Sequence, residues 1–438
     1  MRLGHFLLSG WLLSLPAQAQ PPVSPAGQPV RELAFFQEAA RQSSPLIRDN
    51  QNQLRANTLE AERLRAFYTK PLVSLTANMQ VAPIVSTDDS RIRPELNANG
   101  ATSYVGYDLA VSNGGLYQGL LTVSQPISNL FRYRAYAEPT VLASKISQAV
   151  IRLSAHEVEK MVADQYVLCW QDKLQMQYTD SLLSLLADQR VVVQKLVEAS
   201  LLKLSELTLV DIEQQTQRNI RIAYATAYRR DVLELNALSG IADTTLVDLA
   251  PLPPIATAPF DLSQSGFTQR YALDSLALDA QQTIFNLRYR PQWTAFANTG
   301  LNTSYLPDLP RRLGFSAGVS LVWYLYDGHQ KKISQQRTAV LQRSLGMYRT
   351  FLQTQNAVRR ERVRGELRGL DERAQVFRQQ LADYESVLAA YRRELMQGQL
   401  PVINYILVLK NMVAVRRDAL LLQTNRALLL NAYTYWNW

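Results

Sequence analysis

Two long stretches of this 438-residue chain contain no proline, one between Pro139 and Pro251 and one between Pro310 and Pro401. Proline breaks a helix interior because it lacks an N–H and clashes with the preceding turn. Within the second stretch, apolar residues are spaced alternately by four and by three: Val363, Leu367, Leu370, Ala374, Phe377, Leu381, Tyr384, Leu388, Tyr391 and Leu395. This heptad seam predicts a long helix that packs along another helix.

Such a helix is too long for a compact domain. Over residues 331–397 it would extend roughly 100 Å at about 1.5 Å per residue. A bilayer core is only about 30 Å thick, so we expect the helix to stand outside the membrane. Its other faces carry Arg and Gln, which indicates that water reaches at least one side, as at the wall of a tube.

Four short segments alternate apolar and polar residues, which predicts strands at about 71–84, 115–127, 291–304 and 313–326. A soluble sandwich would also have two such faces. The segment lengths, and the aromatic residues near the segment ends, favour membrane-crossing strands with interfacial girdles. These aromatics are Tyr117, Trp293, Trp323, Tyr324 and Tyr326. Four strands cannot close alone, and a conducting pore needs at least three chains and about twelve strands.

The chain repeats one plan of helix, strand, strand, long helix, turn and helix. "VSQPISNLFRYR" (123–134) aligns with "LVWYLYDGHQKK" (321–332). A shift of 198 residues places Asn129 on Asp327, and the same shift places Glu206 on Asn404 near the later turns. Upstream the shift is 220, so the first copy carries 22 extra residues between its strands. We expect these residues to form a loop.

The expected organisation follows from this repeat. A basic residue, an apolar run and a small-x-small site indicate a cleavable signal peptide, because the run is too short for a membrane anchor. The resulting segments are a signal peptide at 1–19, a flexible tail at 20–30, the first repeat at 31–248, a Pro-rich linker at 249–265 and the second repeat at 266–438. The net charge is +9, but the Arg residues are scattered along helices, which does not favour nucleic-acid binding.

Strand and helix meet directly in both copies. Asp327 with Gln330 resembles a capping box, and Asn129 is the matching candidate N-cap. Pro126 is expected to end sheet pairing, while Pro139 either kinks the following helix or delays its start. With Gly328, the residues Pro126, Asn129 and Asp327 make up the predicted strand–helix junctions.

The order of elements, the duplication and the segments "SQPISNLFRYR", "WYLYDGHQKK" and "MQGQLPVINYILVL" resemble the TolC-type outer-membrane efflux family over residues 30–438. The resemblance implies an α+β fold in which each chain of a homotrimer contributes four strands to a 12-stranded membrane β-barrel. A long periplasmic α-helical barrel continues it. It further implies outer-membrane lipid around the barrel, and a periplasmic adaptor (membrane fusion protein) and an inner-membrane pump as partners.

By the same resemblance, the helices turn back at about 197–205 and 397–404 to form a periplasmic mouth that opens by an iris-like shift. Family members often place acidic residues after the second turn, where this chain has Asn404 and Leu407. Glu206 keeps an acid in the first copy, either as part of a gate or as a solvated helix end. The remaining candidates for this tip are Lys203, Lys410, Gly398 and Pro401.

Residues suited to catalysis are scarce. After removal of the signal peptide only His156, His329 and Cys169 remain of the His and Cys residues, and they do not have metal-ligand spacing. No phosphate loop, dinucleotide fingerprint or nucleophile elbow occurs, so we expect neither an enzyme nor a cofactor. The alternative to a passive efflux or type I secretion duct is a soluble or peripheral periplasmic coiled-coil structural protein without transport activity.

Overall fold

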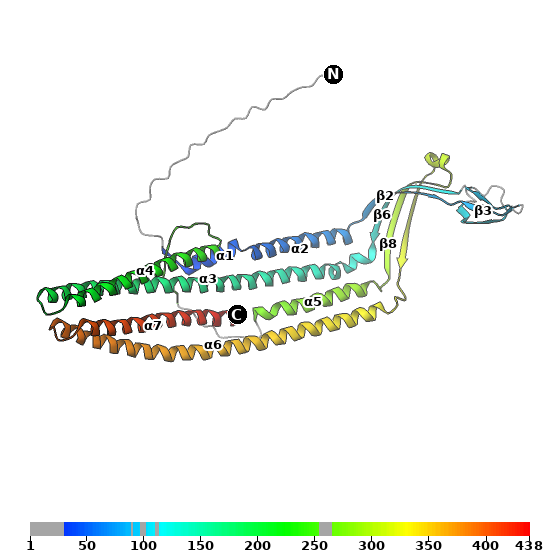
Figure 1. The fold of residues 1–438 in the computed structure, drawn as a ribbon. Coiled ribbons are helices and arrows are strands. Elements are labelled where there is room, and N and C mark those ends of the chain that lie inside the picture. The colour runs from blue at the N-terminus through cyan, green and yellow to red at the C-terminus, as the bar shows by residue number, and fades with distance from the viewer. Residues whose placement is uncertain (1–29, 89–90, 97–101, 110–113, 254–264) are drawn as a thin grey trace, which may run out of the picture.

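The chain forms an elongated molecule with a sheet at one end and two helical turns at the other (Figure 1). The computed structural model describes residues 30–88, 91–96, 102–109, 114–253 and 265–438. The expected signal peptide and residues 20–29 of the expected tail lie outside these ranges. Val30, which was also assigned to the tail, belongs to the first strand.

Seven helices run along the molecule in the described ranges: α1 (Leu33–Ser43), α2 (Pro45–Thr69), α3 (Ile127–Glu198), α4 (Leu204–Leu238), α5 (Gly266–Leu287), α6 (Gln330–Met396) and α7 (Val402–Trp436). Most strands belong to two sheets, with β2 (Leu72–Val81), β6 (Gly115–Pro126), β8 (Gln292–Thr303) and β9 (Leu313–Val322) in the larger. A 3-10 helix, η4 (Leu306–Arg311), connects β8 to β9.

The two halves of the chain follow the same plan. Helices α4 and α7 each have 35 residues, and both of their ends are offset by 198 positions. The last residues of α3 and α6 have the same offset. Ser200 and Gly398, which the repeat aligns, both adopt the left-handed conformation, with φ of 61° and 69°. The helical turns are therefore equivalent in backbone geometry as well as in position.

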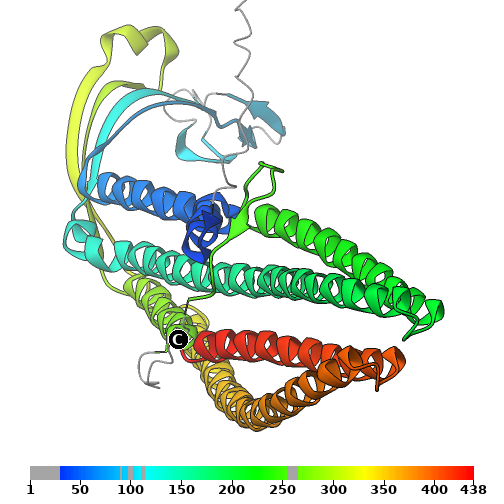
Figure 2. The same cartoon turned by 90° about the vertical axis from the view of Figure 1, so that its left-hand side faces the viewer.

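Helix α6 buries the predicted seam. Every seam residue from Val363 to Leu395 is buried or half-buried, whereas most residues between them are exposed. The helix has 67 residues and α3 has 72. Helix α3 packs against α2, α4, α5 and α7, and α6 packs against α5 and α7. In the end-on view α6 bows away from α7 midway along its length (Figure 2).

The larger sheet is antiparallel, with the order β2-β6-β8-β9. One row of paired residues runs across the sheet from Leu75 of β2 through Leu121 of β6 and Thr299 of β8 to Phe315 of β9. The alternate residues align Ser74 with Thr122, Asn298 and Ser316. Because successive side chains point to opposite faces, one face of the sheet is mainly apolar and the other is mainly polar. The exceptions include Leu120 and Phe296 on the polar face and Thr299 on the apolar face.

A small unit on the flank consists of α1 and two short parallel strands, β1 (Val30–Arg31) and β7 (Asp248–Leu249). Its core joins α1 to α3 and α4 through Phe36, Tyr166, Cys169, Tyr228 and Leu235. The Tyr166 hydroxyl donates to the backbone oxygens of Ala250, at 2.6 Å, and Arg31. Leu249, the first residue of the expected linker, is therefore part of this unit rather than a loose connection.

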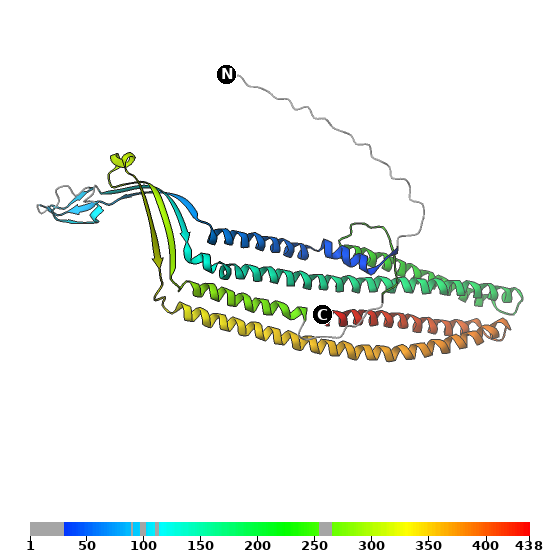
Figure 3. The same ribbon diagram turned by 180° about the vertical axis from the view of Figure 1, so that it is seen from behind.

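The extra residues of the first copy do not form only a loop. They contain a three-stranded sheet in the order β4-β3-β5, made of β3 (Ile84–Ser86), β4 (Arg93–Glu95) and β5 (Tyr104–Val105). This sheet projects beyond the far ends of β2 and β6, as the view from behind also shows (Figure 3). The insertion lacked a clear period, so its strands were not predicted.

The strand–helix junctions differ from the expected caps. Helix α3 begins at Ile127 with Pro126 as its N-cap, so Asn129 lies inside the helix and Pro139 does not delay its start. At the second junction β9 ends at Val322, short of the expected Tyr326. His329 is the N-cap of α6, and Gly328 also has positive φ. Asp327 nevertheless accepts a bond from the Lys331 N–H at 2.8 Å.

In the part of the chain that the structure describes, none of the helices is both long and apolar enough to cross a membrane. Apolar side chains remain exposed on the helices and also on the sheet. On β2, Leu75 and Met79 are 78% and 73% exposed. On β9, Leu313 and Phe315 are exposed to a similar extent. An apolar surface of this size marks a contact with lipid or with protein.

Candidate functional site

The tip of the molecule is held together by a hydrophobic core that joins the α3–α4 turn to the α6–α7 turn. Leu186, Val193 and Val210 of the first hairpin meet Leu395 and Ile406 of the second, with further members in Leu182, Leu388, Val402, Tyr405 and Leu409. Helices α3 and α7 are in direct contact. The two turns therefore belong to one packed end, and neither hairpin is an independent arm.

Most of the residues predicted for the tip lie in the two turns or close to the starts of α4 and α7. Lys203 is exposed and is the N-cap of α4, and Glu206 is half-buried one turn later. Pro401 is the N-cap of α7. It is followed by Asn404, which is exposed, and by Leu407, which is 57% exposed. Gly398 allows the left-handed turn between α6 and α7.

Lys410 forms its ion pair with Glu213 rather than with Glu206. Its Nζ lies 3.0 Å from Oε2 of Glu213, two turns further along α4. The side chain of Glu213 is only 5% exposed, whereas that of Lys410 is 56% exposed. Gln217 donates to Glu213 Oε1 at 2.8 Å. The pair links the two hairpins above the tip, and the buried carboxylate has partners on two helices.

This ion pair lines a cavity of about 330 Å³ between α3, α4 and α7. Its wall combines polar and aromatic side chains, including Tyr178, Gln175, Tyr224 and Arg417. Gln175 is almost fully buried, and its Nε2 reaches the backbone oxygen of Arg417 on α7 at 3.5 Å. A polar interface of this kind can separate at a lower cost than an apolar one, because water can satisfy the exposed groups.

Farther from the tip along α3 and α4, Asp172 of α3 faces Asp231 of α4. Asp172 is 7% exposed, and its Oδ2 has no hydrogen-bond partner among the described residues. Burial, followed by the neighbouring charge of Asp231, raises the pKa of Asp172 to about 7. Arg230 forms an ion pair with Asp231, with 2.7 Å between Nε and Oδ1. Asp172 therefore stays protonated to a higher pH than an exposed aspartate would.

The polar face of the sheet contains no charge. None of the strands β2, β6, β8 and β9 carries an Asp, Glu, Lys or Arg residue on either face. Amides and hydroxyls line the polar face: Gln118 donates to Asn302 Oδ1 at 3.2 Å, and Ser316 donates to Asn298 Oδ1. Such a surface can be wetted without selecting strongly between cations and anions.

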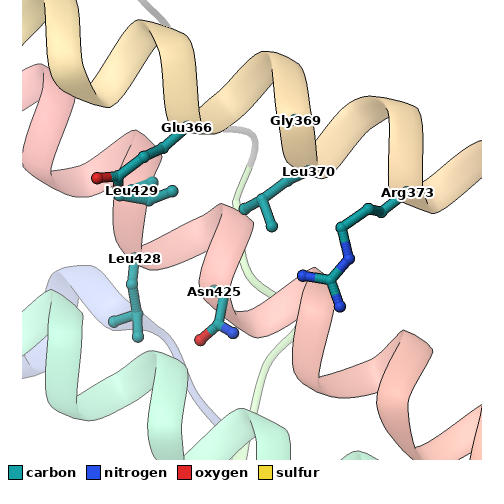
Figure 4. A pocket seen from close by; sticks show the side chains of 7 residues that line it. All are labelled: Glu366, Gly369, Leu370, Arg373, Asn425, Leu428 and Leu429. Atoms are coloured by element: carbon teal, nitrogen blue, oxygen red, sulfur yellow. The ribbon is translucent and has the colours of Figure 1, made fainter.

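A shallow groove of about 570 Å³ lies between α6 and α7 where the two helices separate (Figure 4). Leu370, Leu428 and Leu429 line it together with Glu366 and Arg373. A Cβ atom added at Gly369 would meet nothing within 4 Å. The groove is open and mainly apolar, and it lacks the converging acid and base that catalysis would require.

His156 and Cys169 both have structural surroundings. His156 stacks between Tyr435 and Trp438, with ring centroids 4.9 and 4.4 Å away, and its Nε2 lies 3.1 Å from the Tyr435 backbone oxygen. Burial lowers its pKa. Cys169 is buried in the core of the flank unit. Across the described residues, no group of three or more His, Cys, Asp and Glu is arranged to hold a metal ion.

Sequence reasoning missed the roles of Glu213, Asp172 and Asp231. All three lie on long helices where acidic residues are common on solvated faces. A signal was nevertheless present: Glu213 and Asp172 both lie close to apolar positions that face a neighbouring helix, such as Val210 and Cys169. Their burial becomes visible only once the helices are placed in register.

Comparisons with solved structures agree on the architecture. The chain superposes with a TM-score of 0.67 on the open state of the outer-membrane channel MtrE of Neisseria gonorrhoeae, at 13% identity, covering 92% of this chain and 88% of that one. On the outer-membrane protein VceC of Vibrio cholerae it superposes with a TM-score of 0.66 at 14% identity, covering 92% of this chain and 95% of that one. On a membrane protein of Pseudomonas aeruginosa the TM-score is 0.70 at 12% identity, with 95% of this chain and 96% of that one covered.

No protein-family model and no curated protein matches the sequence. The evidence from comparison is therefore structural, and it extends over more than nine-tenths of the chain in each case. The resemblance stated from the sequence is confirmed at the level of the fold: this chain has the fold of TolC-type outer-membrane channels.

Proposed function

We propose that the protein is the outer-membrane exit duct of a tripartite efflux or type I secretion system and acts as a passive trimeric conduit. The observation that carries this proposal is the sheet of four charge-free strands with one mainly apolar and one mainly polar face, continued by the long helices α3 and α6. An apolar outer face and a polar inner face are what a water-filled membrane barrel requires.

The open edges of the sheet support a trimer. Strands β2 and β9 each have one neighbour in the described sheet, and an exposed edge tends to pair with another strand. Joining β9 of one chain to β2 of the next closes the sheet without leaving an edge. Three chains supply about twelve strands, enough to enclose a channel, whereas about eight would be filled by their own side chains.

The gate belongs at the helical tip, where the hairpins meet. Opening moves α4 and α7 against their neighbours in an iris-like shift. The Glu213–Lys410 ion pair joins α4 to α7 and opposes the part of that shift that separates these two helices. Three copies of Glu206 around the channel axis would contribute negative charge at this level, while Asn404 and Leu407 contribute none. A periplasmic adaptor and an inner-membrane pump supply the work of opening, since no energy-converting site occurs among the described residues.

The decisive experiment combines conductance in planar lipid bilayers with the mass of the detergent-solubilised oligomer. We expect discrete channels and a mass of three mature chains. A water-soluble monomer that never enters lipid would overturn the proposal. Cross-linking the tip with paired cysteines then tests the gate: locked trimers should conduct poorly and should not support export, and normal export by locked trimers would contradict gating at the tip.

A periplasmic coiled-coil structural protein is the alternative. The seam of α6 fits that alternative, but the exposed apolar face of the sheet would then be unexplained. Within the duct hypothesis, efflux and type I secretion are distinguished by the pump with which the protein is co-purified. A resistance-type pump indicates small solutes, and an ABC exporter indicates polypeptides.

A further inference from the structure

A pocket of about 290 Å³ opens at the foot of the sheet, where β6 continues into α3. It is lined by Ile127, Ser128, Phe131, Arg132, Trp293 and Val319. Trp293 and Val319 belong to the apolar face of the sheet, because they alternate with Thr294 and Ser320 of the polar face. Phe131 is 85% exposed and Val319 is 60% exposed. The pocket is thus a continuation of the apolar surface toward the helices.

The polar groups of this pocket come from α3. Arg132 Nη2 donates to the backbone oxygen of Pro291 at 3.1 Å, but its Nη1 is buried and has no acceptor among the described residues. Its guanidinium is not within ion-pair distance of any described carboxylate. Ser128 Oγ accepts from the Trp293 N–H at 2.7 Å, which fixes the start of α3 against β8. A buried guanidinium nitrogen without an acceptor lacks a charge-assisted hydrogen bond.

If the sheet spans the membrane as proposed, its interfacial aromatic residues place this pocket at the level of the lipid headgroups. Trp293 pairs with Leu321 in the second row from the helical end of the sheet, and Tyr117 pairs with Met79 near the opposite end. Tryptophan and tyrosine concentrate at the two interfaces of a membrane. Arg132, one turn into α3, lies just beyond the apolar rows, where a cationic side chain can reach a phosphate from an apolar surface.

We propose that this pocket binds a phospholipid of the periplasmic leaflet, with the phosphodiester on Arg132 and the start of an acyl chain over Phe131, Trp293 and Val319. The assignment rests on the proposed membrane function. The bound lipid would set the depth of the barrel in the membrane and fix the strand-to-helix junction. A free phosphate would make no use of the apolar walls, and an uncharged lipid would leave Arg132 Nη1 without its acceptor.

The test measures lipid binding to the detergent-solubilised full-length protein by native mass spectrometry. The probes are dioleoylphosphatidylglycerol, dioleoylglycerol with the same chains but no phosphate, and inorganic phosphate as a competitor. The variants are Arg132→Gln, which removes the charge, and Phe131→Ser, which shortens an exposed side chain that has little part in folding. Arg134→Gln is the matched control, because Arg134 is exposed on the same helix.

We expect saturable binding of phosphatidylglycerol, weakened about tenfold by Arg132→Gln and severalfold by Phe131→Ser, and unchanged in the control. Equal binding of dioleoylglycerol, competition by inorganic phosphate alone, or wild-type affinity in both variants would overturn the assignment. Conductance of the same preparations separates the two proposals. Variants that conduct normally while binding lipid like the wild type refute only the lipid site, whereas a wild-type protein that never conducts refutes the duct.

Discussion

Lys410 of α7 and Glu213 of α4 join the two helical hairpins through an ion pair with a nearly buried carboxylate. The hairpins come from opposite halves of the duplicated chain. The ion pair lines the polar cavity between α3, α4 and α7. Glu213 depends on Lys410 for its countercharge and on Gln217 for a second hydrogen bond. The pair therefore ties α4 to α7 near the tip, where the proposed gate lies.

Replacing Lys410 with methionine should loosen the tip. The substitution leaves a buried carboxylate without its countercharge, at a cost of about 1–3 kcal/mol to the closed arrangement, reduced by the exposure of the lysine. We expect higher single-channel conductance and a lower Tm than in the wild type. Lys203→Met is the control, since it removes the same charge from an exposed position at the same end. If both variants conduct equally, the pair has no gating role.

The Asp172–Asp231 pair should make stability depend on pH. Burial raises the pKa of Asp172 to about 7, against about 3.9 in an unfolded chain. The folded chain thus keeps a proton that the unfolded chain has lost, and the stabilising contribution is present at acid pH and declines as the pH rises from about 4 to about 7. It should be constant above that range. Asp172→Asn imitates the protonated form and should raise the Tm at pH 8.

The Tm of the detergent-solubilised protein at pH 5 and pH 8 measures this effect. The Asp172→Asn variant should show a smaller difference between the two values than the wild type. Asp188→Asn, an exposed change on the same helix, should keep the wild-type difference. An unchanged pH dependence in Asp172→Asn would show that the carboxyl pair does not control the packing of α3 on α4.

Periodicity made the large elements predictable. The seam from Val363 to Leu395 and the alternation from Val73 to Val81 are local patterns, and both describe the observed faces. The partner of Lys410 was not predictable in this way, because Glu213 lies 197 residues away and its identity depends on how α4 and α7 are placed. Asn129 was expected as an N-cap because residues of that type favour the position. The helix instead begins at Ile127, directly after Pro126.

Neighbouring residues on β8 test which face of the sheet meets water. Asn298 shares the polar face with Thr122 and Ser316, and Ala297 shares the apolar face with Val123 and Ala317. Asn298→Asp should insert normally and shift the reversal potential toward cation selectivity, because three copies add negative charge to an uncharged wall. Ala297→Asp should insert poorly, since a charge on a lipid face costs up to about 2–4 kcal/mol. The opposite outcome would reverse the assignment of the two faces.

Gly300 should be essential for pairing between β6 and β8. Its φ is +152°, and a Cβ atom built there would lie 2.0 Å from the backbone oxygen of Gly119. Gly300→Ala is therefore expected to destabilise the sheet by more than about 2 kcal/mol, through backbone strain and displacement of the neighbouring strand. Gly119→Ala is the matched control, because its added Cβ would meet nothing within 4 Å. Denaturant titration of the refolded protein should separate the two variants clearly, and equal stability would contradict the close approach.

Ser200 and Gly398 occupy equivalent positions in the two helical turns. We therefore expect that replacing each with the other's residue type changes the Tm in opposite directions. Ser200 occupies the left-handed conformation that its counterpart Gly398 adopts without a side chain, and a non-glycine residue there costs roughly 1–2 kcal/mol. Ser200→Gly should therefore raise the Tm of the solubilised protein, although the greater freedom of glycine in the unfolded chain offsets part of the gain. Gly398→Ser should lower the Tm for the same reason. If both substitutions lower the Tm, the Ser200 side chain makes a contribution that outweighs its backbone strain, and the two turns are not energetically equivalent.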